Sequence, residues 1–171
     1  MTPQPLSGQE RSGSGSAREP AITAFDGKHA FLSNFYPSAI EHEGYWYDTV
    51  EHLFQASKTV TFTDHHVVRL ATSPGKAKRL GRSLPLRDDW ENVKADVMRI
   101  GLQLKFAPGG DMAARLLATG DRELVEGNTW GDEVWGKTFR NVDGLLGWHG
   151  ENLLGRLLME RRDQLRFGST D

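Results

Sequence analysis

The sequence predicts a single α+β domain that is mainly helical and carries a small antiparallel sheet. Three observations predict this class. Apolar residues recur at helical spacing through most of the chain after residue 48. The stretches that alternate or are rich in aromatic residues are short and lie before that point. Finally, 171 residues of which 37% are hydrophobic are enough for one core but hardly for two.

Two short segments at the start of the domain are expected to be strands. AITAF at 21–25 is apolar and short, and AIEHEGYWY at 39–47 partly alternates and contains three aromatic residues. Glu43 and Gly44 are expected to form the turn of a hairpin within the second segment. The sheet that these strands form is therefore small.

Six later segments have the periodicity of helices. The longest, at 89–106, can use Asp88 or Asp89 as its N-cap and ends before Pro108 and Gly109. We expect it to be the central core helix because its apolar residues fall at steps of three and four. The six segments cover about 48–59, 64–71, 74–82, 89–106, 110–118 and 151–165.

Residues 120–150 are expected to form a long loop. Glycines and acidic residues there surround Trp130, Trp135 and Trp148. Long aromatic loops in compact domains usually have a binding role. We therefore expect part of a binding site in this segment.

The first twenty residues are expected to be a flexible leader to a domain at 21–168. They contain Gly, Ser, Pro, Gln and charged residues, with few side chains that can anchor to a core. Nothing in the chain resembles a signal peptide or an apolar run of membrane-spanning length. A cytoplasmic protein without membrane attachment is the expectation.

Composition excludes several classes of protein. A formal net charge of -2 argues against coating of a nucleic-acid backbone by bulk charge, while leaving room for a local basic patch. The absence of cysteine excludes disulfides and thiolate zinc sites. The six histidines lack the HExxH arrangement, and GxGxxG, P-loop and GxSxG motifs are missing. We therefore expect neither a metal nor a cofactor.

The segment YDTVEHLFQASK at 47–58 places Glu51, Gln55 and Lys58 on one stripe beside the apolar face of a helix. This stripe is either a solvated flank or the wall of a pocket. With Asp48 as N-cap, Glu51 would fill the third position of a capping box, and the residues alone favour that role over catalysis. Lys58 is equally explained as a solvated residue near a helix C-terminus.

Three further features are open to a structural or a functional interpretation. Trp90 is more often a core residue than a ligand platform. Arg82 clusters with Arg79 and Arg87 around a helix end, where an anion could be held. Asn34 in FLSNF must satisfy a donor and an acceptor if it is buried, through either the backbone or the ribose or base of a ligand.

Seven separated segments together resemble the NADAR (YbiA-like) family. They span about residues 22–166 and occur in the family's order: FLSNFYP, YDTVEHLFQASK, SPGKAKRLGR, WENVKADVM followed by LKF, LLATGDRELVE, WGD and GENLLGRLLMERR. The resemblance implies a compact, mainly helical α+β fold of the YbiA-like kind. The chain departs from some family members at 133–149, where they have a shorter glycine-rich loop.

The resemblance also implies an activity. Family members are N-glycosidases of ribosides: those paired with DarT-type toxins remove ADP-ribose from guanine, and others cleave ribosylamino intermediates of the riboflavin pathway. The resemblance does not choose between these substrates. The family's polar motif residues fall here on Asn34, Glu51, Lys58, Arg82, Trp130, Asp132 and Asn152.

With these residues, the resemblance implies an N-glycosidase site, and the chemistry it implies needs no metal. The expected catalytic residues are Glu51, Lys58 and Asp132, and the expected substrate-binding residues are Asn34, Arg82, Trp90, Trp130 and Asn152. The expected substrate is ADP-ribosylated guanine, with transient nucleic-acid contact, or a small ribosylamino compound. A non-catalytic module that binds ADP-ribose or NAD is the alternative from another class.

Overall fold

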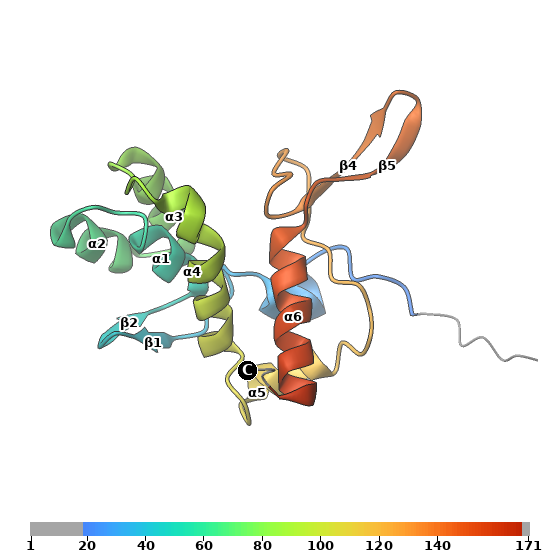
Figure 1. The fold of residues 1–171 in the computed structure, drawn as a ribbon, viewed down its shortest axis with the longest axis horizontal. Coiled ribbons are helices and arrows are strands. Elements are labelled where there is room, and N and C mark those ends of the chain that lie inside the picture. The colour runs from blue at the N-terminus through green and yellow to red at the C-terminus, as the bar shows by residue number, and fades with distance from the viewer. Residues whose placement is uncertain (1–18, 169–171) are drawn as a thin grey trace, which may run out of the picture.

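Helices dominate the described part of the chain, residues 19–168 of this computed structural model (Figure 1). A short 3-10 helix, η1 (Gly27–Leu32), precedes them. The α-helices are α1 (Val50–Ala56), α2 (Phe62–Arg69), α3 (Pro74–Ser83), α4 (Trp90–Lys105), α5 (Asp111–Leu117) and α6 (Leu153–Phe167). The predicted mainly helical α+β class is confirmed. The predicted leader lies outside the described residues except for its last two.

The start of α1 differs from the prediction. Thr49 is the N-cap, and its side chain accepts a hydrogen bond from the backbone N–H of His52. Glu51 is thus the second residue of the helix, and its side chain bonds to other side chains rather than back to the cap. The predicted capping box of Asp48 and Glu51 is wrong, because the helix begins one residue later.

Helix α1 is the buried centre of the helical layer. It packs against α2, α3 and α4, and all seven of its residues are buried. Gly101 of α4 allows a close approach of the two helices, because a Cβ there would lie 2.8 Å from Cγ1 of Val50. Since no face of α1 meets solvent, Glu51 and Gln55 are buried as well.

Helix α4 is part of the core, as predicted. It packs against α1 and α6. Its buried residues are Trp90, Met98, Gly101, Leu102 and Lys105. The apolar residues whose steps of three and four predicted this helix include Val93, Val97, Ile100 and Leu104, which are only partly buried and pack against the core.

The N-terminal strands were predicted in part. Strands β1 (Ile40–His42) and β2 (Tyr45–Tyr47) form the expected antiparallel hairpin, with Ile40 opposite Tyr47. Its turn residues, Glu43 and Gly44, both have positive φ. The expected strand at 21–25 is wrong: only Ile22 makes a bridge, to Leu124.

A second sheet replaces part of the long loop that was expected at 120–150. It consists of β3 (Gly127–Asn128), β4 (Lys137–Val142) and β5 (Leu145–His149), in that order. Strand β3 pairs parallel with β4, and β4 pairs antiparallel with β5. The β4–β5 hairpin extends away from the helices (Figure 1). Within the described residues, no helix is long and apolar enough to cross a membrane.

Candidate active site

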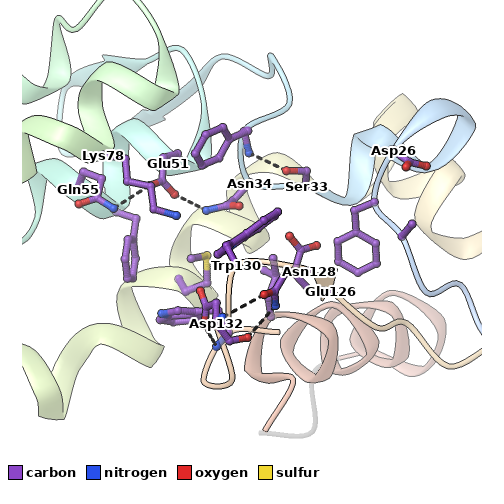
Figure 2. Close-up of a pocket in the computed structure, with 18 of the residues that line it drawn as sticks. Asp26, Ser33, Asn34, Glu51, Gln55, Lys78, Glu126, Asn128, Trp130 and Asp132 are labelled. Atoms are coloured by element: carbon purple, nitrogen blue, oxygen red, sulfur yellow. Dashed lines mark hydrogen bonds between the residues drawn. The ribbon is translucent and has the colours of Figure 1, made fainter. Parts of the chain in front are cut away.

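A pocket of about 460 Å³ lies between the first helices and the segment around β3. One wall comes from residues 33–35, α1 and α3, and the other comes from residues 126–135 (Figure 2). Its size suits a ligand as large as a nucleotide. Six of the eight sequence-predicted site residues line it: Asn34, Glu51, Lys58, Arg82, Trp130 and Asp132.

Glu51 is the most enclosed polar group on this wall, with 2% of its surface exposed. The side-chain amide of Asn34 donates to its Oε2, and the Gln55 amide donates to its Oε1 at 2.7 Å. Burial raises the pKa of Glu51 to about 6, although the Gln55 hydrogen bond and nearby cations oppose this. Glu51 is therefore an ionised but poorly solvated carboxylate at neutral pH.

Lys58 lies just beyond α1 and is partly buried on the same wall. Its Nζ lies 5.1 Å from the centre of the Phe54 ring and 5.5 Å from that of the Trp90 ring. Burial lowers the pKa of Lys58, and Glu51 partly offsets this effect. The stripe of Glu51, Gln55 and Lys58 is thus the wall of a pocket and not a solvated flank.

Trp90 and Asn152 were expected to bind substrate, but neither lines the pocket. Trp90 is buried and packs edge-to-face on Phe54 at 4.9 Å, behind Lys58. Asn152 is buried before α6, where its side chain accepts from the N–H of Glu126 at 3.0 Å and donates to the carbonyl of Leu124 at 2.8 Å. Each of the two supports a residue of the wall instead.

The cations on the wall come from two places. Lys78 and Arg82 lie one turn apart on α3, and Lys58 follows α1. Arg87, also in the predicted arginine cluster, instead pairs with Asp89 on the surface. Among the described residues that line the pocket, Lys58, Lys78 and Arg82 are therefore the cations that could pair with an anion.

Trp130 and Asp132 belong to the loop that follows β3. Trp130 is 69% exposed at the pocket and lies between the Asn34 side chain and Asp132 in Figure 2. Oδ1 of Asp132 accepts the backbone N–H of Trp135 at 2.9 Å, and Asn128 brackets the Asp132 backbone with two hydrogen bonds. This use of the carboxylate fixes the loop that presents Trp130.

Sequence reasoning missed Lys78, Asn128 and Glu126, which also line the pocket. Burial and the charge of Asp132 raise the pKa of Glu126 to about 7. The only signal for Glu126 in the sequence is that the family-like segment LLATGDRELVE ends on it. No group of three His, Asp or Glu side chains within residues 19–168 is arranged to hold a metal ion.

Two poorly solvated carboxylates and a desolvated lysine in one pocket define an enzyme-type site for acid–base chemistry. The chain belongs to the NADAR domain family, whose model matches residues 23–166. The resemblance seen in the sequence is thereby confirmed.

Named relatives agree with this assignment. The N-glycosidase YbiA of Escherichia coli (strain K12) is 44% identical over 136 residues, which are 78% of this chain and 80% of the relative. An N-glycosidase of Nostoc punctiforme is 39% identical over 79% of this chain and 85% of its own length. A riboflavin biosynthesis protein of Vibrio vulnificus is 38% identical over 82% of this chain but only 37% of its own length.

The fold has a solved counterpart. The NMR structure of the E. coli protein YbiA matches with a TM-score of 0.71 and 39% identity, covering 88% of each chain. The predicted YbiA-like fold is confirmed. With relatives that are named N-glycosidases, the predicted class of enzyme, a hydrolase of N-glycosyl bonds, is confirmed as well.

Proposed function

We propose that this pocket hydrolyses the bond between ribose C1 and a guanine nitrogen, and so removes ADP-ribose from guanine. The observation that carries the proposal is the placement of Glu51: a buried carboxylate held by two amides, on the same wall as a desolvated lysine. Such a group suits a reaction in which positive charge develops on the sugar.

Cleavage of an N-glycosyl bond passes through a state in which C1 resembles an oxocarbenium ion. The carboxylate of Glu51 stabilises that charge and accepts a proton from the attacking water. Asn34 and Gln55 fix both oxygens of Glu51, so the group needs little reorganisation when charge appears. We expect Asp132 to contribute by holding the Trp130 loop.

Lys58 admits a second route through the same pocket. Its lowered pKa increases the fraction of neutral amine, which is the nucleophilic form. If the ribose ring opens with the C1–N bond intact, C1 becomes the carbon of an imine to guanine. The Lys58 amine adds to C1, the C1–N bond to guanine then breaks with its electron pair and a proton going to the guanine nitrogen, and water hydrolyses the resulting Lys58 Schiff base to the free sugar and the amine. Otherwise Lys58 contributes only charge.

The remaining wall suits a substrate with phosphates and bases. Lys78 and Arg82 supply positive charge for a pyrophosphate, and the exposed Trp130 supplies a ring on which a base can stack. A second hollow of about 290 Å³ shares Gly127 and Asn128 with the pocket. The two cations and the exposed ring support ADP-ribosylated guanine, which carries a pyrophosphate and two bases, over a smaller riboside.

A second candidate substrate is a ribosylamino intermediate of riboflavin synthesis. It is favoured by two relatives whose names refer to riboflavin biosynthesis, from Vibrio vulnificus and Zea mays. A purely ADP-ribose-binding module is less consistent with the site, because binding of an anion gains nothing from Glu51 and Glu126 beside it.

The deciding experiment compares turnover of two substrates by the same preparation. One is a single-stranded oligonucleotide carrying ADP-ribosylated guanine, and the other is a phosphorylated ribosylaminopyrimidine. Mass spectrometry follows the released products. The proposal predicts a higher kcat/KM for the first substrate; a higher value for the second would select the riboflavin-type activity, and binding of both without turnover would indicate a binding module.

A further inference from the structure

Glu126 presents a second carboxyl group to the pocket, from the wall that does not carry Glu51 (Figure 2). Its backbone is held on both sides: the N–H donates to Oδ1 of Asn152 at 3.0 Å, and the carbonyl accepts from the N–H of Lys137 at 2.9 Å. The side chain therefore projects from a fixed point.

The carboxyl group itself is not used by the surrounding protein. Its Oε2 is buried and has no hydrogen-bond partner among the described residues. An ionised oxygen in that position loses hydration without compensation, which is unfavourable. A protonated carboxyl group avoids this cost and has an O–H that it can donate to a ligand.

Glu126 holds its proton up to about neutral pH, chiefly because it is buried. Burial and the negative charge of Asp132 raise its pKa, and Lys78 lowers it less. By contrast, Glu51 receives two side-chain amide hydrogen bonds and has Lys58, Lys78 and Arg82 near it. The charged residues that line the pocket with Glu126 are Asp26, Glu51, Lys58, Lys78, Arg82 and Asp132.

We propose that Glu126 is the general acid of the reaction, which protonates the departing nitrogen while Glu51 acts on the sugar and the water. This inference rests on the proposed N-glycosidase function. Two carboxyl groups in one site that differ in proton affinity commonly divide the roles of acid and base in this way.

The proton balance of the step is complete. As the C1–N bond breaks, its electron pair stays on nitrogen, and the Glu126 carboxyl group gives that nitrogen a proton. Water forms the new C1–O bond and loses a proton to Glu51. Release of the amine and the sugar, followed by proton exchange with solvent, restores protonated Glu126 and ionised Glu51.

The test is the pH dependence of kcat/KM for Glu126→Gln, with Glu123→Gln as the matched control. Glu123 is a nearby glutamate outside the pocket that pairs with Lys137 at the surface. The wild-type rate should fall as the pH rises through about 7, where Glu126 loses its proton. Glu126→Gln should lower kcat about 10²-fold or more, leave KM nearly unchanged and abolish this alkaline fall.

Glu123→Gln should reproduce the wild-type profile. If Glu126→Gln keeps normal turnover and the alkaline fall, the inference is overturned while the proposed function stands. A wild-type protein that cleaves no riboside overturns both. Titration of ¹³C-labelled glutamate side chains adds a test that needs no substrate: the signal lost in Glu126→Gln should titrate near neutrality, and titration near 4.5, the ordinary value, would overturn the assignment.

Discussion

Asn34 and Glu51 hold each other through two hydrogen bonds. The side-chain amide of Asn34 donates to the Glu51 carboxylate, and the backbone carbonyl of Asn34 accepts the Glu51 N–H at 3.0 Å. Lys105 in turn donates to the carbonyl of Ser33 at 2.7 Å and so anchors the segment. The position of the carboxylate is thus fixed by a segment outside its own helix.

Glu51→Gln should lower turnover by about 10²- to 10⁴-fold while the protein remains folded. Glutamine has the same shape but cannot accept the proton of water or stabilise positive charge on the sugar. The check is an activity assay beside a thermal melting curve. Normal activity with reduced stability would return Glu51 to a structural role.

The same substitution should change how stability depends on pH. The pKa of Glu51 is about 6 in the folded protein against an ordinary 4.5, so the folded state binds the proton more tightly. The stabilisation that comes from this tighter proton binding is therefore fully present below pH 4.5 and is lost as the pH rises through about 6. The free energy of unfolding changes by about 2 kcal/mol over this range. Urea denaturation measures the free energy of unfolding at pH 4.5 and 7.5. Relative to the wild type, that of Glu51→Gln should be higher at pH 7.5 than at pH 4.5. An unchanged difference between the two proteins would contradict the raised pKa.

Lys58→Arg separates the two roles of the lysine. Arginine keeps the positive charge but provides no nucleophilic amine. Near-normal turnover would show that Lys58 supplies only charge. The Schiff-base route predicts loss of turnover in Lys58→Arg with retained product binding, and trapping of an ADP-ribosyl adduct at Lys58 when borohydride is added during wild-type turnover. An adduct at Lys94 or Lys105, located by peptide mapping, would identify a different nucleophile.

Gly81→Ala should disturb Glu51 from a distance. A Cβ at Gly81 would lie 2.3 Å from Oε1 of Gln55, so the Gln55 amide that holds Glu51 must move. We expect lower turnover and a loss of about 1–3 kcal/mol of stability. Gly75→Ala on the same helix is the control, because the nearest atom there is Nη1 of Arg79 at 3.8 Å. Equal effects of the two variants would exclude the mechanism through Gln55.

Asn152 should affect activity through the hydrogen bond that it accepts from the backbone N–H of Glu126. Asn152→Ala removes the acceptor of the Glu126 N–H and must keep a φ of 54°, which disfavours alanine. Asn152→Gly loses the same hydrogen bonds but tolerates that φ. Both variants should lose activity. Asn152→Ala should be less stable than Asn152→Gly by about 1 kcal/mol. Denaturant melts measure this difference, and equal stability of the two variants would rule out a contribution from the backbone conformation.

The sequence was most informative about elements that are defined by local periodicity. All six helical segments and the 39–47 hairpin lie where the spacing of apolar residues predicts them. The β4–β5 hairpin was missed although Asp143 and Gly144, both with positive φ, carry a typical turn signal between its strands. Many residues of these strands are exposed, so hydrophobic alternation gave little help.

The site was harder to predict because it is assembled from distant segments. Glu51 and Lys58 could be placed on one stripe of a helix, but only the packing of α1 among three other helices buries that stripe. The backbone of Glu126 is held beside the pocket by its hydrogen bond to Asn152, a partner 26 residues away in the sequence. Trp90 shows the reverse case, in which a residue type common in binding sites belongs to the core.

Product analysis after reaction with guanine-ADP-ribosylated oligonucleotide identifies the bond that the pocket cleaves. Cleavage at the N-glycosyl bond predicts two products from the wild-type protein, an oligonucleotide with unmodified guanine and intact ADP-ribose, with both nearly absent for Glu51→Gln. Mass spectrometry distinguishes this from cleavage of the pyrophosphate, which leaves phosphoribose on the base. A phosphoribosyl remnant, or equal product formation by wild type and Glu51→Gln, would contradict N-glycosyl hydrolysis that depends on Glu51.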